Sequence, residues 1–448
     1  MRQAYITSLA VSGVKNIKNK IEMKFSNQVK TNFTLEKTNI KAIYGPNGSG
    51  KSGIIHAMEI YEKLTKYIDF LSDNINQRYI AHLINNETKK FEICVEFIIF
   101  DSETNKVINQ YAHEIKLEKL DNDIVIITDD VLKQFKNKNG SIIETEIIYQ
   151  VKNGIITSNY IHDTVLQKAT NLLNKRTFID IFMGKGPSVL YQASADEHLY
   201  KAEKILRDLI RFIFSVRTTT ENDDQHWGYV NRYHEQVNKQ NGMIEENEEL
   251  DSPYNEIRLS DHSDRIRVNQ LAQYQENVKR LTEFMKLFKP ELIKIETIEK
   301  QDGETIVIDK LFVYPNHKIH IEFESAGIKK LVTLFEEFNF LMKKRGILFI
   351  DELDAKINDV YLIKLIQFFD EYLKGQLVFT THNVSPMEIL KLRKHSIDFM
   401  SSKGEITHWI KNGNYSAQNL YRKGLIKNLP FNMEYYDFLG ILGDLDDE

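Results

Sequence analysis

The sequence is poor in the residues that build cross-linked or flexible proteins. Its 448 residues include one cysteine, Cys94, with 7 prolines and 20 glycines. A single cysteine excludes an internal disulfide framework and any zinc site that takes several thiolates from one chain. The shortage of proline and glycine argues against long flexible or proline-rich linkers. One thiol also suits a reducing compartment, and we expect a cytoplasmic protein.

Long apolar runs and an excess of positive charge are also missing. No segment reaches the roughly 18 apolar residues that cross a bilayer. The N-terminus, MRQAYITSLAVSGVKN, has no sustained apolar core of a signal peptide, so we expect no contact with a membrane. The formal net charge of −5 argues against a protein whose whole surface binds nucleic acid, but it is compatible with a local basic groove.

The remaining composition, with 42% hydrophobic and 27% charged residues, is that of an ordinary folded soluble protein. Residues 1–161 are predicted to form an N-terminal lobe. Alternating apolar residues predict strands near 21–25, 91–97 and 111–117, and DIVIITD and EIIYQV are two further short strands. A helical pattern covers about 51–71. Because Asp, Asn and Gly connect the strands, we expect a β-meander.

The character changes to helical over 162–290. KAEKILRDLIRFIFSV places Ile205, Leu209 and Ile213 on one face, and HSDRIRVNQLAQYQENVKRLTEFMKLF is predicted to be a second long helix. The acidic segment 221–254 between them is predicted to be an exposed loop, with a partner-binding segment as the alternative.

Strands resume in residues 291–448, with ETIVIDKLFVY and KIHIEF. Helix and strand patterns then alternate to about residue 386, which predicts a parallel sheet. Together the patterns predict an α/β fold in which a helical insertion separates a β-meander lobe from a parallel-sheet lobe.

The most specific motif is a glycine-rich segment that follows the strand NIKAIY and opens a helix. It consists of Gly45, Pro46, Asn47, Gly48, Ser49, Gly50, Lys51 and Ser52 (the P-loop). Its glycines let successive backbone N–H groups face a phosphate, and the helix N-terminus adds positive potential. We expect Lys51 to reach the β- and γ-phosphates and the Ser52 hydroxyl to ligate Mg²⁺. An ordinary glycine turn is the alternative, and the strand–helix context argues against it.

Two acids follow a buried strand in the segment GILFIDE, which ends at Asp351 and Glu352. Ligands bind at the carboxyl edge of open α/β sheets. Asp351 is therefore the candidate to hold Mg²⁺, directly or through water, and Glu352 the candidate general base for an attacking water. A strand that ends in solvated acids is the alternative.

Two further segments have anion-binding character. The strand QLVFT runs into Thr381, His382 and Asn383, and a histidine there could hydrogen-bond a γ-phosphate or the attacking water. Ser325 and Gly327, in ESAGIKKL, open a helix whose N-terminus would attract an anion. A second such helix cannot serve the nucleotide that the P-loop already encloses. The alternatives are a polar strand end and a simple helix cap.

The order of these four motifs resembles that of the ABC-type ATPase heads of the RecF, SMC and OLD group. The resemblance implies a P-loop NTPase that binds ATP and Mg²⁺ between two heads, with Ser325 and Gly327 facing the partner's P-loop and His382 as the switch histidine. Asn358 stands where many relatives carry Asp. The glutamine that links the lobes in such heads has three candidates, which are Gln77, Gln110 and Gln150.

The phrases DELDAKIN, FTTHN and YRKGLIKNLPFNMEYYDFL are similar to stand-alone AAA family ATPases of bacterial abortive-infection and phage-defence systems, of the AbiL type and like AriA of the PARIS system. This resemblance implies a self-associating regulatory ATPase that gates a separately encoded nuclease effector in response to a phage trigger. We expect no nuclease domain after Asn383. Alternatives are a RecF-like ATPase that binds DNA in repair or recombination, and a scaffold that binds ATP but barely hydrolyses it.

Two basic clusters bear on the DNA alternative. Lys343-Lys344-Arg345 is one, and Lys391, Arg393 and Lys394 form the other. Such clusters are more often solvated faces than DNA grooves. The sequence also lacks the basic, aromatic-interleaved stretch that single-strand binders use.

Overall fold

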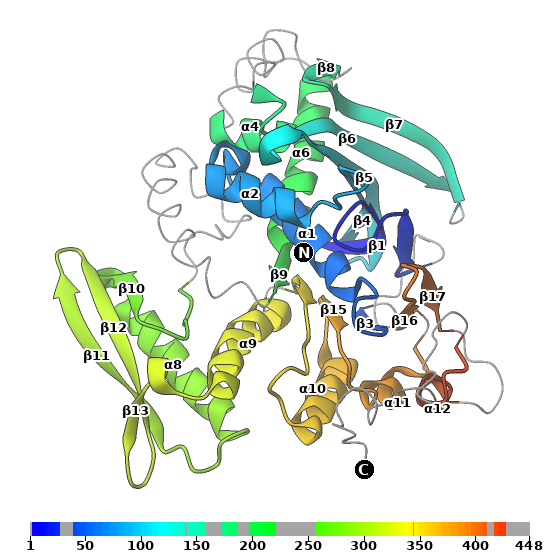
Figure 1. Cartoon of the computed structure of the whole chain (residues 1–448). Coiled ribbons are helices and arrows are strands. Elements are labelled where there is room, and N and C mark those ends of the chain that lie inside the picture. Colours follow the sequence, from blue (N-terminus) through cyan, green and yellow to red (C-terminus); the bar gives the residue numbers. More distant parts are fainter. Residues whose placement is uncertain are drawn as a thin grey trace, which may run out of the picture.

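The computed structural model describes residues 2–26, 39–138, 141–157, 172–185, 197–220, 257–343, 345–393, 395–409 and 416–426 (Figure 1). The acidic segment 221–254 that we predicted to be a loop lies outside these residues.

The N-terminal lobe is a seven-stranded antiparallel sheet in the order β2-β1-β4-β5-β6-β7-β8. Its strands are β1 (Arg2–Ser12), β2 (Ile21–Lys24), β4 (Lys90–Asp101), β5 (Lys106–Lys119), β6 (Val125–Lys138), β7 (Ser141–Lys152) and β8 (Ile155–Thr157). Strands β4 to β8 follow one another in space as they do in sequence, which confirms the predicted β-meander. β6 and β7 are longer than the two short strands predicted there.

The second sheet has six strands in the order β17-β16-β3-β15-β14-β9. They are β3 (Ile40–Tyr44), β9 (Val216–Thr219), β14 (Ile347–Ile350), β15 (Gln376–Thr380), β16 (Ile397–Met400) and β17 (Ile406–His408). Only β17 pairs antiparallel. The predicted parallel sheet, and with it the α/β class, is therefore confirmed. β9 joins this sheet from a part of the chain that was predicted to be helical.

Helices cover both faces of this parallel sheet. Ile43, Phe349 and Val378 face one hydrophobic core with α1 (Lys51–Lys66) and α6 (Glu197–Ser215). Tyr44, Ile350 and Phe379 face another core with α9 (Ala326–Lys343), α10 (Asp359–Tyr372) and α11 (Pro386–Leu390). Strands buried on both faces are continuously apolar because alternate side chains enter opposite cores.

The first core also reaches the seven-stranded sheet, so that α1 and α6 lie between the two sheets (Figure 1). The predicted apolar face of α6 is confirmed, since Ile205, Leu209 and Ile213 are at most 3% exposed. Further helices are α2 (Asn74–Leu83), α4 (Phe178–Lys185) and α12 (Ala417–Arg422), and 3₁₀ turns η2 (Phe70–Ser72) and η3 (Asp121–Asp123) lie in the N-terminal lobe. Across the described ranges, no helix has the length and apolar character that crossing a bilayer requires.

A small third sheet has the order β10-β12-β11, with β13 also paired to β12. Its strands are β10 (Asp264–Arg267), β11 (Lys294–Asp302), β12 (Thr305–Val313) and β13 (Lys318–His320), with 3₁₀ turns η6 (Val268–Gln270) and η7 (Ile321–Phe323). Together with α8 (Leu271–Lys286) they share a core with the first half of α9. This unit stands apart at the lower left of Figure 1.

The helix predicted from about His262 instead begins at Leu271, so its predicted start was wrong. The reason is the period of two in 264–267: Ile266 is buried while Arg265 and Arg267 are exposed, and these residues pair with β12. This pairing also joins residues on both sides of the predicted domain boundary at 290. The boundaries 1–161, 162–290 and 291–448 stay predictions.

Candidate functional site

The predicted site residues follow neighbouring parallel strands. β15 lies between β3 and β14, and β9 lies beyond β14. Register pairs Ile350 with both Phe379 and Thr219, and Thr380 with Ile43. Because parallel strands end at the same edge of a sheet, the P-loop, the segment at 351–354 and the segment at 380–383 lie side by side at the carboxyl edge.

Three glycines fix the path of the P-loop. Gly48 and Gly50 have φ values of +74° and +103°, in the left-handed region that side chains disfavour. A Cβ on Gly45 would lie 2.3 Å from the carbonyl oxygen of Met400, at the end of β16. The loop thus packs against the neighbouring strand so closely that its first position requires glycine.

The start of α1 is equipped for an anion. Gly50 provides no side-chain cap for the helix, and no acid occupies the first turn. The first N–H groups of a helix have no intrahelical acceptor, so an uncapped N-terminus binds anions. The hydroxyl of Ser49 is buried and has no hydrogen-bond partner among the described residues. Asn16 Nδ2 donates to the carbonyl of Gly48 at 2.8 Å, which pins the loop from the end of the β1 region.

Lys51 folds back over its own loop. Its Nζ donates to the carbonyls of Gly45 at 2.9 Å and Pro46 at 3.2 Å, and the residue is 6% exposed. Burial lowers the pKa of Lys51, and the carboxylates of Asp351, Glu352 and Asp354 oppose this shift. The lysine and the acidic strand end are therefore electrostatic neighbours.

Thr380 joins the two acids. Its hydroxyl donates to Asp351 Oδ1 at 2.5 Å and accepts the N–H of Glu352 at 2.8 Å. Asp351 is 5% exposed. Glu352 has a φ of +47°, a conformation that costs a non-glycine residue roughly 1–3 kcal/mol and is concentrated at functional sites. One hydroxyl on β15 thus holds the carboxylate of Asp351 and the backbone of Glu352.

His382 belongs to the same group. Its backbone N–H donates to Asp354 Oδ2 at 3.3 Å. Partial burial and the positive charge of Lys51 lower the pKa of His382, and Asp354 and Asp351 oppose them. A lowered pKa keeps the imidazole neutral near pH 7, with one N–H to donate and one nitrogen to accept.

Ser325 and Gly327 lie at the start of α9. Ser325 is exposed, and its hydroxyl accepts the N–H of Ile328 at 3.3 Å, which is the geometry of a helix cap. A Cβ on Gly327 would lie 3.2 Å from the carbonyl of Lys356. Asn358 caps α10 by accepting the N–H of Val360 at 3.0 Å. The structure therefore leaves Ser325 at the surface, where it would be open to a second molecule.

The glutamines considered for linking the lobes have other contacts. Gln77 bridges η2 and β6, since it donates to the carbonyl of Leu71 and accepts the N–H of Val125. Gln110 bonds Asn137 within the meander, and Gln150 lies on β7. The assignment of that glutamine stays open.

Three residues that contact the P-loop or the acidic strand end were not predicted from the sequence. Thr380 lies within the motif that runs from Gln376 to Asn383, but its bonds to the two acids follow only from the pairing of β14 with β15. Asp354 follows Glu352 so closely that a third acid in DELD was a usable signal. Asn16 carries no signal, because its role depends on the bend between β1 and β2.

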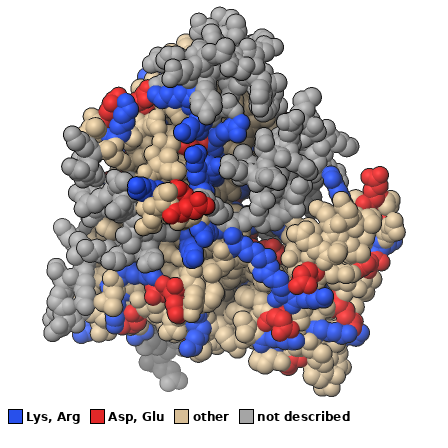
Figure 2. Space-filling view, turned by 180° about the vertical axis from the view of Figure 1, so that it is seen from behind, with Lys and Arg blue, Asp and Glu red and all other residues tan. Residues whose placement is uncertain are grey.

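Two residues of the second basic cluster contact other side chains of the protein. Arg393 Nη1 donates to Asn39 Oδ1 at 2.7 Å, and Lys391 pairs with Glu388 at 2.7 Å. Lys344 and Lys394 lie outside the described residues. On the face in Figure 2, Lys and Arg side chains form a broken band with acidic side chains among them. These contacts favour a mixed solvated surface over a dedicated nucleic-acid groove.

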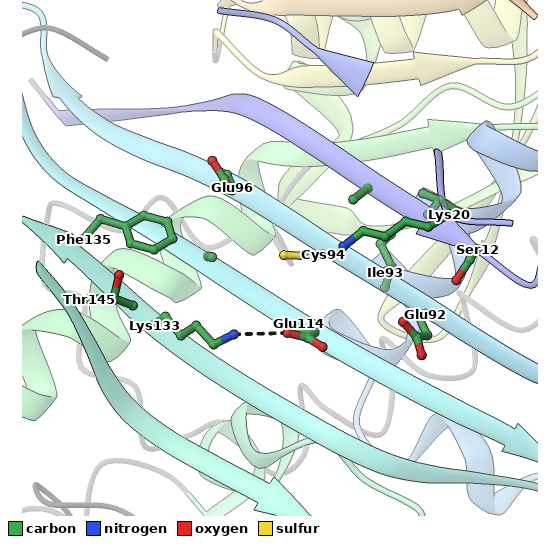
Figure 3. A pocket seen from close by; sticks show the side chains of 13 residues that line it. Ser12, Lys20, Glu92, Ile93, Cys94, Glu96, Glu114, Lys133, Phe135 and Thr145 are labelled. Atoms are coloured by element: carbon green, nitrogen blue, oxygen red, sulfur yellow. Dashed lines mark hydrogen bonds and ion pairs between the residues drawn. The ribbon is translucent and has the colours of Figure 1, made fainter. Parts of the chain in front are cut away.

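A separate hollow of about 360 Å³ lies on the seven-stranded sheet (Figure 3). No P-loop residue lines it. Burial raises the pKa of its Cys94 to about 11, so the thiol stays protonated. Lys133 pairs with Glu114 at 3.2 Å across its floor. With a protonated thiol and no P-loop residue in its lining, the hollow is separate from the site at the parallel-sheet edge.

Replacing Thr380 with valine is expected to reduce any nucleotide turnover at this edge by roughly 10-fold or more, because Asp351 and Glu352 lose their shared partner. Nucleotide affinity should change less, since the P-loop is untouched. Turnover and equilibrium binding of ATP measure the two effects. Thr407→Val, at an exposed position of β17, is the matched control. Unchanged turnover in Thr380→Val would show that the bridge has no role.

No family model and no curated protein matches the sequence. Solved structures similar to the chain include an Smc head domain with an extended coiled coil, bound to the C-terminal domain of ScpA, from Pyrococcus furiosus (15% identity, TM-score 0.39, 91% of this chain and 96% of that one). An Smc head domain with a coiled coil and joint from Pyrococcus yayanosii has 12% identity and a TM-score of 0.42, with coverages of 91% and 98%. The SMC head domain from Thermotoga maritima has 14% identity and a TM-score of 0.32, with coverages of 91% and 99%. At these identities and TM-scores, the similarity assigns no residue role and no function to this chain.

Proposed function

We propose that the protein is an ABC-type ATPase that binds ATP with Mg²⁺ and hydrolyses it to ADP and phosphate. The observation that carries the proposal is the convergence at one sheet edge of a P-loop with an uncapped helix N-terminus, a buried lysine and an acidic strand end. The electrostatic coupling of Lys51 to Asp351, Glu352 and His382 supports a single site.

The P-loop is proposed to hold the phosphates. The backbone N–H groups that open α1 would donate to phosphate oxygens. Lys51, which now donates to two carbonyls of its own loop, would extend a charged donor to the β- and γ-phosphates. The buried Ser49 hydroxyl would gain the hydrogen-bond partner that the described residues do not supply.

Ser52 and Asp351 fit a Mg²⁺ ion that is shared with a nucleotide. Among the described residues no group of three or more His, Cys, Asp or Glu side chains could hold a metal by itself. Mg²⁺ commonly takes one or two protein oxygens and completes its shell with phosphate and water oxygens. A hydroxyl and a carboxylate are the hard ligands it prefers. The ion would neutralise charge that develops on the phosphates.

Glu352 is proposed as the general base and His382 as a neutral partner of the γ-phosphate or of the attacking water. The backbone N–H of Glu352 is bound by Thr380 and its φ is +47°, so the backbone that carries the proposed base is fixed after β14. A neutral His382 would donate one hydrogen bond without adding a charge that repels Mg²⁺.

The test is equilibrium binding and hydrolysis of ATP with and without Mg²⁺, on the wild type and on Lys51→Ala. The wild type should bind ATP, and it should release phosphate only when Mg²⁺ is present. Lys51→Ala should lose most of the affinity, because the charged donor to the phosphates is gone. A wild type that binds no nucleotide would refute the proposal.

A finer proposal concerns the biological role. The phrases DELDAKIN, FTTHN and YRKGLIKNLPFNMEYYDFL support a regulatory ATPase of an anti-phage system that gates a separately encoded nuclease. ATP would shift a two-state assembly by its differential affinity for the two states. The gene alone, the gene with its neighbour, and Lys51→Ala with the neighbour should be challenged with phages. Protection by the lone gene, or undiminished protection by the Lys51→Ala pair, would contradict an ATP-gated regulator.

A further inference from the structure

β7 is an edge strand over most of its length. It pairs with β6 on one side, but on the other side β8 pairs only with Gln150–Lys152. Within the described residues, no strand pairs with the outer side of 142–147. Figure 1 shows β8 at one end of β7 and the rest of β7 along the outside of the lobe. The outward N–H and C=O groups of such a strand can pair with a strand of another molecule.

This edge also exposes large apolar side chains. Ile143 is 63% exposed and Ile147 is 45% exposed. Thr145 lies between them, pairs with Phe135 of β6, and lines the hollow on this sheet with it (Figure 3). An exposed edge strand that is rich in β-branched residues is a template for the addition of a further strand.

The sequence of the edge is complementary to itself. Residues 142–148 read IIETEII, which is the same in both directions about Thr145. Thr145 lies in the regular part of the pairing with β6, which runs from Glu144 to Ile147. Two antiparallel copies related by a two-fold axis at Thr145 therefore place Ile143 of each copy opposite Ile147 of the other. Cross-strand pairs of β-branched side chains stabilise a sheet.

The charges of the edge are compatible with this register. It places Glu144 opposite Glu146 of the second copy, and like charges in opposite positions destabilise a sheet. Each carboxylate, however, has a lysine from its own chain. Lys136 Nζ lies 2.9 Å from Glu144 Oε2, and Lys201 Nζ lies 3.3 Å from Glu146 Oε2. The lysines compensate the negative charge, so the register does not set unpaired carboxylates against each other.

We propose that the outer edge of β7 pairs antiparallel with the same edge of a second copy of the chain, in a register centred on Thr145. The seven-stranded sheets of the two copies then form one continuous sheet. The contact uses no residue of the P-loop or of α9, so it is independent of the proposed ATP binding. With a second interface across the nucleotide, it would build assemblies larger than a dimer.

Charges placed at the two isoleucines test the pairing in the full chain. Ile143→Lys/Ile147→Lys sets lysine opposite lysine across the axis, and Ile143→Glu/Ile147→Glu sets glutamate opposite glutamate. Each double variant alone should raise the dissociation constant of self-association by about 10²-fold or more. An equal mixture of the two should associate again, because every introduced lysine then faces an introduced glutamate.

Sedimentation velocity without nucleotide, with Lys51→Ala in every chain, measures this association apart from any contact through bound ATP. The control is Ile75→Lys/Ile298→Lys, which adds the same charge at two other exposed isoleucines and should associate like the parent chain. A parent chain that stays monomeric, or a lysine variant that associates like the parent, would overturn the inference. A mixture of the lysine and glutamate variants that stays dissociated would also overturn it, because the occupant of the edge would then not be a second β7.

Discussion

Replacing Glu352 with glutamine is expected to stop ATP turnover while ATP remains bound. The amide keeps the size of the carboxylate and its place after β14, but it cannot accept the proton of an attacking water. Turnover should fall by about 10²- to 10⁴-fold, the usual contribution of a general base. The Kd for ATP with Mg²⁺ should stay within about twofold, because the P-loop, Lys51 and Asp351 are unchanged.

The measurements are single-turnover hydrolysis and equilibrium binding at the same Mg²⁺ concentration. Glu388→Gln is the matched control, because Glu388 lies on α11 and pairs with Lys391 at 2.7 Å. It should turn over ATP at the wild-type rate. Near-normal hydrolysis by Glu352→Gln would remove Glu352 from the role of base and leave Asp354, the other acid coupled to Lys51, as the next candidate.

The residues at the sheet edge could be predicted because each lies in a local pattern. A strand, a glycine-rich turn and a helix appear consecutively around Lys51, and four apolar residues run directly into Asp351. Such patterns report which side chains follow a strand. They do not report which strands are neighbours, so the position of β15 between β3 and β14 emerged only from the register of Thr380 with Ile43.

Other features depend on contacts between distant segments. The hydroxyl of Thr380 bridges to Asp351 and Glu352 across 29 and 28 positions. β9 enters the parallel sheet from the predicted helical insertion. Arg393 appeared in the sequence as part of a basic cluster, yet it bonds Asn39 across 354 positions. Local composition cannot distinguish a basic side chain that hydrogen-bonds within the protein from one that is available to bind DNA.

Two inactive variants are expected to regain ATPase activity when they are combined in one dimer, because α9 begins at the surface of the protein. Ser325 and Gly327 open a helix N-terminus at the surface, and we propose that they complete the nucleotide site of a second copy. Lys51→Ala should be inactive because its P-loop fails, and Ser325→Arg because a bulky cation would block the contact in trans. In a mixed dimer, the P-loop of the Ser325→Arg subunit faces the intact α9 of the Lys51→Ala subunit. One composite site is then wild type in every residue.

Co-expression with two affinity tags and sequential purification would isolate the mixed dimers. In an equal mixture, half of all dimers are mixed, and each mixed dimer has one intact site of two. An unfractionated mixture should therefore regain about a quarter of wild-type activity.

Ser325→Arg also removes a helix cap, which costs about 0.5–2 kcal/mol in typical helices. Asp73→Arg removes the cap of α2 in the same way, since Asp73 accepts the N–H groups of Ile75 and Asn76. That control should stay active alone. ATPase activity of Ser325→Arg alone, or no ATPase activity in the purified mixed dimer, would show that α9 does not act on a partner's nucleotide.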